Sequence, residues 1–380
     1  MSIEQHIKDH QNLYLKMLEE SVNMDSPSKN KHNSDRVAQW YANQFENLIA
    51  GGAVKMIKNK EYGDFLRCQI GDGDKQLLLI GHFDTVFPMG ESEKRPFYIK
   101  EDKAFGPGVY DMKSGILEGF FALKALVDEG EFPSDRSVVF FINSDEEIGS
   151  RSSKQMIMDE ARKSEAALVL ECPMEPDGSL KTSRKGCGRY KIIVEGVSAH
   201  SGVNPQDGVS AIEEMAVQIQ RLHALNNYET GTNVNVGVIK GGLGPNIIAN
   251  FAEAEIDVRV QSSEELNRIE EIFKEFKPVS DGATLQITGG VLRPPMERTD
   301  GIEELFEQAK KIGEVIGMDI KESGTGGGSD GNFIASCGVP LLDGLGIRGG
   351  HAHSPKEFIY VHEIPKKTLF LANLIKSLKI

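Results

Sequence analysis

The chain has 380 residues, of which 39% are hydrophobic and 26% are charged. This length corresponds to about two or three domains of ordinary size, and the hydrophobic share can build a sizeable core, which excludes intrinsic disorder as the main state. Forty-three basic residues against 57 acidic ones leave a net charge of −14. We therefore expect no nucleic-acid partner, because binding to phosphates needs concentrated lysine and arginine.

The cysteines and the apolar runs bear on the cellular location. The four cysteines form no C-x-x-C pair, so neither a thiolate metal site nor a disulfide framework is expected. The longest apolar runs, residues 77–80 and 138–142, are far shorter than the roughly 20 residues of a membrane span. Charges throughout residues 1–20 speak against a secretory signal. We therefore expect a cytoplasmic protein with reduced thiols and no membrane partner.

Short apolar runs alternate with a helical pattern in the first half of the chain. Residues 76–80, 137–143 and 166–170 have the continuous apolar character of strands in parallel sheets that are covered on both faces. Between the first two runs, residues 113–128 repeat apolar side chains at helical spacing. This β-α-β order predicts an α/β sheet.

The pattern changes from Gly186 onward. Alternating, strand-like segments are residues 188–196, 232–240, 251–260 and 283–288, and helical periodicity covers residues 209–225 and 263–276. In the first of these helices, the residues that share one side are Val209, Ile212, Ala216, Ile219 and either Leu222 or His223. The order is β-α-β-β-α-β, the pattern of a ferredoxin-like α+β unit.

After this region the alternation of helices and apolar strands resumes. Residues 299–317 and 362–378 are predicted to be helices, and residues 339–343 a short strand. We therefore predict an α/β domain that is discontinuous in sequence, residues 1–183 and 296–380, with a mostly parallel mixed sheet flanked by helices. An α+β domain, residues 184–295, is inserted into it.

Polar residues stand where the predicted strands end. His82 and Asp84 follow the first strand and point the same way. Such a pair is often only structural, but a metal-binding imidazole also commonly donates its second N–H to a carboxylate. Asp111 lies in a glycine-rich loop before the predicted helix 113–128, where it could cap the helix or bind a metal.

Acidic residues follow the next two strands. One of these strands is followed by Asp145, Glu146 and Glu147. They could form an acidic first helical turn, or one of them could bind a cation while another transfers protons. Glu171 ends the strand at residues 166–170, and a glutamate there is seldom left unpaired. Near the C-terminus, His351 and His353 could belong to a solvated loop or supply ligands.

The positions of these residues converge. Ligand sites of open α/β sheets lie outside the carboxyl ends of the strands, and that is where His82, Asp111, Glu146, Glu147 and Glu171 are expected. Two imidazoles with three or four carboxylates suit a pair of divalent ions, and zinc is the expected metal. A shared carboxylate can hold such ions about 4 Å apart.

Six segments carry a resemblance to a known family, and they cover nearly the whole chain in order: GHFDTVFPMG, EDKAFGPGVYDMKSG, SDEEIGSRSS, VSAHSGVNPQDGVSAI, GPNIIANFAEAEIDVRV and HSPKEFIYV. The sequence resembles the M20 family of metallopeptidases, most of all its glutamate carboxypeptidase branch. The resemblance implies two Zn²⁺ per subunit, with Co²⁺ or Mn²⁺ as substitutes. One ion would be held by His82, Asp111 and Glu171, and the other by Asp111, Glu147 and His353.

The resemblance also implies roles for residues around the metals. Glu146 would be the general base, and Asp84 would orient His82. His353 fits the second ligand position better than His351, because the ligand of the family precedes a short spacer and a glutamate, here Glu357. His351 remains the alternative.

In the resembling family the inserted domain mediates dimerisation, so we expect a homodimer. His200 would reach the active site of the partner subunit and donate a hydrogen bond to the developing oxyanion. Arg259, helped by Asn246, would capture the C-terminal carboxylate of the substrate. Judged from the residues alone, His200 is an exposed loop histidine and Arg259 forms a surface pair with Asp257.

The expected function is metal-dependent hydrolysis of an amide bond. The bond is either the one next to a C-terminal residue, with glutamate as one candidate, or the amide bond of an N-acyl amino acid. Aminoacylase, deacetylase and dipeptidase activities are the alternatives within the family. A serine hydrolase is a rival of another class, because Ser329 lies in a G-x-S-x-G motif and Asp343 and His353 follow in order. It leaves the acidic residues unexplained. A non-catalytic peptide-binding protein is the last alternative, and it would predict a missing ligand or base.

Overall fold

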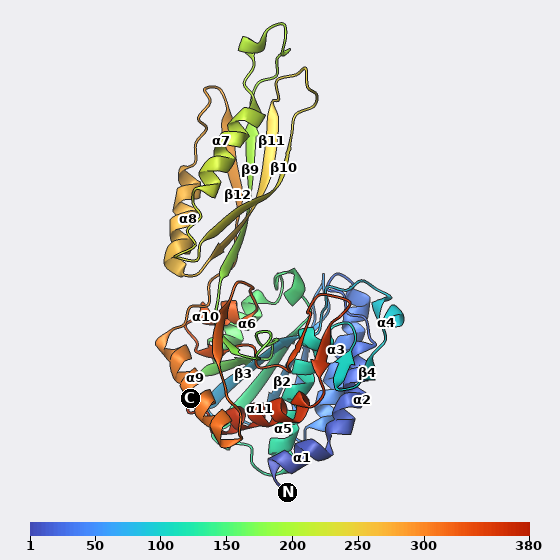
Figure 1. Cartoon of the computed structure of the whole chain (residues 1–380). Coiled ribbons are helices and arrows are strands. Elements are labelled where there is room, and N and C mark those ends of the chain that lie inside the picture. Colours follow the sequence, from blue (N-terminus) through green and yellow to red (C-terminus); the bar gives the residue numbers. More distant parts are fainter. The chain divides into compact units, whose positions relative to one another are not determined.

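The computed structural model describes residues 1–380, which divide into two compact units (Figure 1). The larger unit contains Met1–Ser183, Arg298–Thr325 and Ser329–Ile380. The smaller unit contains Arg184–Glu297 together with Gly326–Gly328. None of the helices is both long and apolar enough to cross a lipid bilayer.

A six-stranded sheet forms the centre of the larger unit. Its strands, in spatial order, are β1 (Ala53–Ile57), β2 (Phe65–Ile70), β6 (Arg136–Asn143), β3 (Lys75–His82), β7 (Ala166–Val169) and β14 (Leu341–Leu342). Strand β3 runs parallel to both β6 and β7, and β14 runs parallel to β7. Strand β2 is antiparallel to its neighbours β1 and β6. The predicted α/β fold with a mixed, mostly parallel sheet is confirmed.

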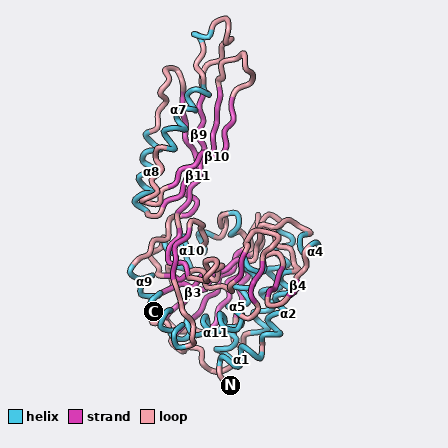
Figure 2. Tube along the Cα trace, in the orientation of Figure 1, coloured by secondary structure: helices cyan, strands magenta, loops and turns pink.

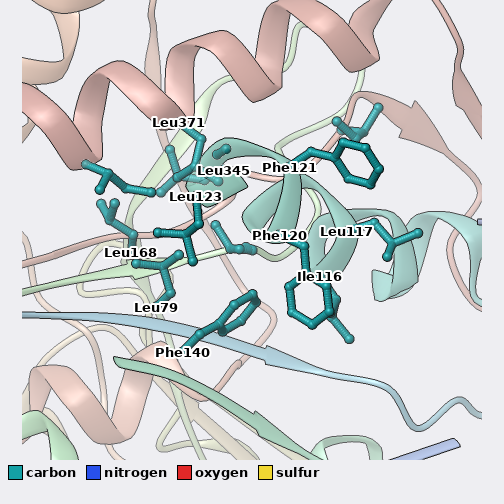
Figure 3. Close-up of a cluster of buried hydrophobic side chains, with 14 of the residues drawn as sticks. Leu79, Ile116, Leu117, Phe120, Phe121, Leu123, Phe140, Leu168, Leu345 and Leu371 are labelled. Carbon is teal, nitrogen blue, oxygen red and sulfur yellow. The ribbon is translucent and has the colours of Figure 1, made fainter. Parts of the chain in front are cut away.

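Helices flank this sheet. They are α1 (Ile3–Asp9), α2 (Gln11–Val22), α3 (Lys31–Leu48), α4 (Glu91–Lys94), α5 (Ser114–Asp128), α6 (Lys154–Ala161), α9 (Asp300–Val315), α10 (Gly331–Ala335) and α11 (Glu363–Ser377). Helix α5 lies between the sheet and α11, and its Phe120 packs against Phe140 of β6 in the same core cluster as Leu79 of β3 (Figure 3). The rings of Phe120 and Phe140 are nearly perpendicular, with centroids 5.8 Å apart, a favourable aromatic geometry. This packing fixes the two strands whose carboxyl ends carry polar residues.

Both faces of the central strands are covered. Along β3, Leu77 and Leu79 belong to the core beneath α5, whereas the equally buried Leu78 and Ile80 point to the opposite face. Helix α6 lies on that opposite face, where its Glu160 carboxylate is 3.1 Å from Nε of Arg67 on β2. Burial on both sides explains why the strand is a continuous apolar run.

Smaller sheets complete this unit (Figure 2). The strands β15 (Gly349–Gly350), β16 (Phe358–Tyr360), β5 (Lys103–Phe105) and β4 (Tyr98–Lys100) form a four-stranded sheet in this order, and β8 (Leu180–Arg184) pairs with β13 (Glu322–Thr325). Strand β16 is antiparallel to β5, with Phe358 opposite Phe105. Because β5 leads into the loop of Asp111 and β16 follows His353, this pairing brings two distant parts of the sequence together.

The smaller unit has the predicted β-α-β-β-α-β order. Its elements are β9 (Gly186–Glu195), α7 (Ala211–His223), β10 (Asn233–Gly241), β11 (Phe251–Val260), α8 (Ser263–Glu275) and β12 (Thr284–Arg293). The spatial order of the strands is β10-β11-β9-β12, and every pair is antiparallel. Each helix begins after a serine, Ser210 and Ser262, whose hydroxyl accepts a hydrogen bond from a backbone N–H of the first turn.

The buried face of α7 differs from the predicted one. Met215 and Leu222 are buried, but Ile212 is 45% exposed. The buried stripe instead includes Glu214, whose carboxylate accepts hydrogen bonds from the backbone N–H groups of Val279 and Ser280. The hydrophobic pattern alone misplaced the buried face of α7, because the distant turn at Val279 and Ser280 packs over the polar side chain of Glu214.

Candidate metal centre

The carboxyl ends of three neighbouring parallel strands carry the acidic and imidazole side chains. His82 is the last residue of β3, and Glu171 lies just after β7. Glu146 and Glu147 belong to a short 3₁₀ turn (Glu146–Ile148) that follows β6. Because β6, β3 and β7 are adjacent and parallel, their ends meet at one edge of the sheet. Polar ligand atoms of His82, Glu146 and Glu171 accordingly lie within 4.8 Å of one another.

Asp111 stands between two imidazoles. It lies in the segment Val109–Lys113 before α5, where its own backbone angles are not helical (φ −115°, ψ 97°). It does not cap α5, whose N-cap residue is Lys113 with no side-chain cap bond. Asp111 Oδ1 is 3.2 Å from Nε2 of His82. Asp111 Oδ2 is 3.1 Å from Nε2 of His353. Each carboxylate oxygen thus faces a different histidine.

One further carboxylate accompanies each histidine. Glu171 Oε1 is 3.4 Å from His82 Nε2, and Glu147 Oε1 is 3.2 Å from His353 Nε2. The imidazole of His351 faces elsewhere, because its ring packs beside Phe358 with centroids 6.0 Å apart. The structure therefore brings His353, and not His351, to the acidic cluster.

Several of these atoms are buried without a hydrogen-bond partner. They are Nε2 of His82, Oδ1 of Asp111 and Oε1 of Glu147. The distance of 3.2 Å between the first two is short, but the directions of the groups do not make a hydrogen bond. Buried polar atoms are nearly always paired, so unpaired polar atoms that converge indicate a missing partner. Imidazole nitrogen and carboxylate oxygen are ligands that Zn²⁺ prefers, so these residues fit a divalent metal.

The electrostatics of the cluster agree with this fit. Burial lowers the pKa of His82, but Asp111, Asp84 and Glu171 outweigh that effect and hold the pKa well above its usual value. Asp111 and Glu147 raise the pKa of His353 to about 11. Burial raises the pKa of Glu147 to about 7. The protonated forms of the two imidazoles are therefore favoured, because positive charge there offsets the carboxylates around them.

Asp84 forms a second layer beneath the cluster. His82 Nδ1 is 3.0 Å from the backbone oxygen of Asp84 and 3.3 Å from its Oδ1. The Asp84 carboxylate also accepts hydrogen bonds from the backbone N–H groups of Glu146 and Glu147, both at 3.2 Å. One aspartate thus connects the His82 ring to the turn that carries both glutamates.

Two supporting residues were not predicted from the sequence. The Ser28 hydroxyl donates to Asp84 Oδ2 at 2.6 Å, and no spacing pattern pointed to it. Glu357 accepts a hydrogen bond from the backbone N–H of Asp111 at 2.9 Å. Its only sequence signal was its position shortly after His353.

The remaining predicted residues lie in the smaller unit. His200 and Asn246 are exposed and lie in adjoining loop segments, where the N–H of Ser201 donates to the Asn246 backbone oxygen at 3.1 Å. Arg259 on β11 makes two hydrogen bonds to the Asp257 carboxylate, at 2.9 and 3.3 Å. The pairing of Asp257 with Arg259, one of the two interpretations of this strand, is therefore present.

Ser329 has the environment of a structural serine. Its side chain is fully buried, and its hydroxyl donates to Asp343 Oδ2 at 2.6 Å. The histidine that follows in the sequence, His353, faces Asp111 and Glu147 instead. A serine nucleophile has to meet both its base and the substrate, so the geometry does not support a serine hydrolase.

A sheet edge that gathers two imidazoles and several carboxylates on an α/β fold defines a metal-dependent hydrolase. Residues 78–377 match the profile of Peptidase family M20/M25/M40, and the chain belongs to this family. The sequence is 30% identical to carboxypeptidase G2 of Pseudomonas sp. (strain RS-16), over 97% of this chain and 90% of that protein. It is 28% identical to succinyl-diaminopimelate desuccinylase of Ehrlichia canis, over 82% of this chain and 84% of that protein.

Solved structures share the fold. An M20 family metallo-carboxypeptidase from Sulfolobus solfataricus has a TM-score of 0.74 at 19% sequence identity, covering 96% of this chain and 98% of that one. A Bacillus subtilis protein described as a dinuclear metal binding peptidase from the M20 family has a TM-score of 0.72 at 14% identity, covering 97% and 98%. At these identities the comparison bears on the fold alone.

Proposed function

We propose that this chain is a zinc-dependent metallopeptidase. It hydrolyses the amide bond next to a C-terminal residue, with glutamate as a candidate, or the amide bond of an N-acyl amino acid. The observation that carries the proposal is the position of Asp111, whose two oxygens face His82 and His353. The similarity to carboxypeptidase G2 along almost the whole chain supports a carboxypeptidase.

The metal ligands divide into two sets that share Asp111. His82, Asp111 and Glu171 would hold one ion, and Asp111, Glu147 and His353 would hold the other, with Co²⁺ or Mn²⁺ as substitutes for zinc. Such ions, when bound, polarise the scissile carbonyl and make water a stronger nucleophile at neutral pH. Asp84 keeps the His82 ring in place, since Nδ1 of that ring is 3.0 Å from the Asp84 backbone oxygen.

Glu146 is the proposed general base. It lies beside Glu147 in the turn after β6, and a carboxylate oxygen of Glu146 belongs to the same group of ligand atoms as His82 and Glu171. Its carboxylate takes a proton from the attacking water and then delivers it to the leaving amine nitrogen. The hydrogen bond from its backbone N–H to Asp84 holds the turn that presents it.

Three residues of the smaller unit bind the substrate in this proposal. The Arg259 guanidinium, helped by Asn246, captures the free carboxylate of the substrate with two parallel hydrogen bonds, the geometry that it now offers to Asp257. His200 donates a hydrogen bond to the oxyanion, acting across a homodimer of this chain. Exposure of His200 and Asn246 is compatible with these roles.

A glutamine substitution at Glu146 tests the catalytic proposal. We expect E146Q to lower kcat by about 10²- to 10⁴-fold, because it removes the proton-transfer group, and to keep the zinc content of the wild type. E147Q is the matched comparison, since it should lose metal and activity together. The proposal is refuted if E146Q retains full activity, or if the wild type keeps its activity after exhaustive treatment with a chelator.

The substrate class needs its own experiment, because relatives in this family include an acetylornithine deacetylase as well as the desuccinylase. We propose a panel of N-acyl amino acids and dipeptides, each with a free or an amidated α-carboxyl group. Cleavage of the free acids alone would support capture of a carboxylate by Arg259. Equal cleavage of the substrates with an amidated α-carboxyl group would count against a carboxypeptidase. It would favour a deacetylase that recognises the acyl group.

We also propose a cytoplasmic homodimer. The four cysteines, Cys68, Cys172, Cys187 and Cys337, form no disulfide, in keeping with a reducing compartment. Sedimentation of the purified chain over a range of concentrations tests the oligomeric state, and a monomer at every concentration would contradict it.

A further inference from the structure

Glu357 is a buried carboxylate that holds the backbone of the Asp111 loop. Its side chain is almost fully buried, with 1% of its surface exposed. Oε1 accepts hydrogen bonds from the N–H groups of Tyr110 and Asp111, at 2.8 and 2.9 Å, and Oε2 accepts one from Gly108 at 3.2 Å. Three backbone donors of one loop thus meet at a single side chain.

The Asp111 loop is also held by other contacts: the Cys172 thiol donates to the Tyr110 backbone oxygen, and the Lys113 ammonium donates to the backbone oxygens of Ser21 and Met24. Gly106 and Gly108 have positive φ angles of 151° and 75°, conformations that glycine adopts easily and that leave the loop outside regular helix or strand. Backbone N–H groups buried in such a loop need acceptors, because an unpaired one destabilises the folded chain. Glu357 supplies the acceptor for the N–H of Asp111 itself, so its position helps to set where the Asp111 carboxylate lies.

The same residue lies at the end of the His353 turn. The backbone N–H of Glu357 donates to the Ser354 oxygen at 3.2 Å, and β16 begins at the next residue. Since β16 pairs with β5, which leads into the Asp111 loop, Glu357 connects the segment that carries His353 with the loop that carries Asp111. The side chain of Glu357 thus holds the Asp111 loop, while its backbone belongs to the turn that carries His353.

We propose that Glu357 is a positioning residue of the metal centre, which orients Asp111 so that its two oxygens face His82 and His353. This inference rests on the proposed function and deepens it by naming a residue that controls metal affinity. Partners that orient metal ligands typically contribute 10- to 100-fold to metal affinity or activity. We expect a loss of that size when the Glu357 carboxylate is replaced.

The substitution Glu357→Gln is the sharpest change. The glutamine oxygen can keep the bonds from Tyr110 and Asp111, but its NH₂ group then faces the N–H of Gly108, so two donors meet. Glu357→Asp is the second variant, because it keeps the charge and withdraws the carboxylate by one methylene. Glu214→Gln is the matched control, since buried Glu214 also accepts two backbone N–H bonds, at 3.0 and 2.7 Å, but lies in the smaller unit.

The experiment is a titration of the metal-free, full-length variants with Co²⁺, followed by the visible absorption of the bound ion. We expect E357Q to bind Co²⁺ about 10- to 100-fold more weakly than the wild type, E357D to be intermediate, and E214Q to bind like the wild type. Excess metal should restore part of the kcat of E357Q, whereas the lowered kcat of E146Q should not change with metal concentration. Circular dichroism checks that each variant is folded.

The outcomes separate this inference from the proposed function. A folded E357Q or E357D that binds Co²⁺ as tightly as the wild type overturns the positioning role. An equal loss of affinity in E214Q overturns it too, because the effect would then follow from general destabilisation. The titration needs no turnover, so a wild type that binds Co²⁺ but cleaves no amide would refute the peptidase and leave the role of Glu357 standing.

Discussion

The Asp84 carboxylate accepts a hydrogen bond from the backbone N–H of Glu146 at a distance of 3.2 Å. The same side chain is fully buried and lies 3.3 Å from the His82 ring. A proposed metal ligand and a proposed general base are therefore held by one carboxylate, although they follow different strands. Their relative position depends on the neighbouring parallel strands β3 and β6 and on this bond.

We predict that Asp84→Asn weakens metal binding by about 10- to 100-fold, because an amide in place of one oxygen presents a donor where the carboxylate accepts hydrogen bonds. Ser28→Ala is the matched control, since it removes only the hydroxyl that donates to Asp84, and its effect should stay below 10-fold. Competition with a calibrated chelator measures both. Wild-type affinity in D84N would show that Asp84 does not position the site.

The two C-terminal histidines should differ in their effect on metal content. His353→Ala removes the imidazole that faces Asp111 and Glu147, so we expect one of two zinc ions per chain to be lost, together with activity. His351→Ala should keep both ions, because its ring lies against Phe358. Elemental analysis after dialysis measures the stoichiometry. Loss of zinc in H351A but not in H353A would reverse the assignment.

Arg259 and Asp257 give a prediction about substrate binding. Because a lysine cannot reproduce the two parallel hydrogen bonds of a guanidinium, Arg259→Lys should raise KM by about tenfold or more while changing kcat less. Asp257→Asn leaves Arg259 in place and removes the negative charge and one of the two oxygens that now accept its hydrogen bonds, so it should leave KM unchanged or lower it. Steady-state kinetics with an N-acyl amino acid as substrate measures KM and kcat of both variants. An unchanged KM in R259K would exclude Arg259 from carboxylate binding.

Glu118 on α5 predicts a pH dependence of stability. It is fully buried, its oxygens make no hydrogen bond, and burial raises its pKa to about 8 against an opposing effect of Lys367. An unfolded glutamate titrates near pH ~4.3, so the folded chain holds this proton more tightly. The contribution of Glu118 to the free energy of unfolding is therefore full below that pH and is lost as the pH rises toward about 8.

Urea unfolding of Glu118→Gln across this range, with a chelator present, should show a smaller decline of stability with rising pH than the wild type shows. Glu214→Gln should behave differently. Burial would raise the pKa of Glu214, but its hydrogen bonds with Gln218 and Ser280 outweigh burial and lower it, so its contribution is lost as the pH falls. If wild type and E118Q have parallel pH profiles, Glu118 does not titrate in this range.

Local patterns were sufficient for much of the fold. Residues 113–128 were predicted to form a helix and residues 137–143 a strand, and the structure has α5 at Ser114–Asp128 and β6 at Arg136–Asn143. The helix has a clear period and the strand is a continuous apolar run, and both elements are buried in the core. The two-residue strand β15, Gly349–Gly350, has no period at all and exists only because β16 pairs with it. The sheet that joins the Asp111 and His353 segments was therefore not predicted.

The sequence by itself determined the class of fold and the chemical character of the site. The apolar runs, the ends of the strands and the spacing of His82, Asp111 and Glu171 can all be identified from the order of the residues. Only the tertiary structure decided which oxygen of Asp111 faces which histidine, that Ser329 is buried, and that Glu357 holds the Asp111 loop. The reason is physical. These relationships are hydrogen bonds and burial between segments far apart in the chain, and no local period records them.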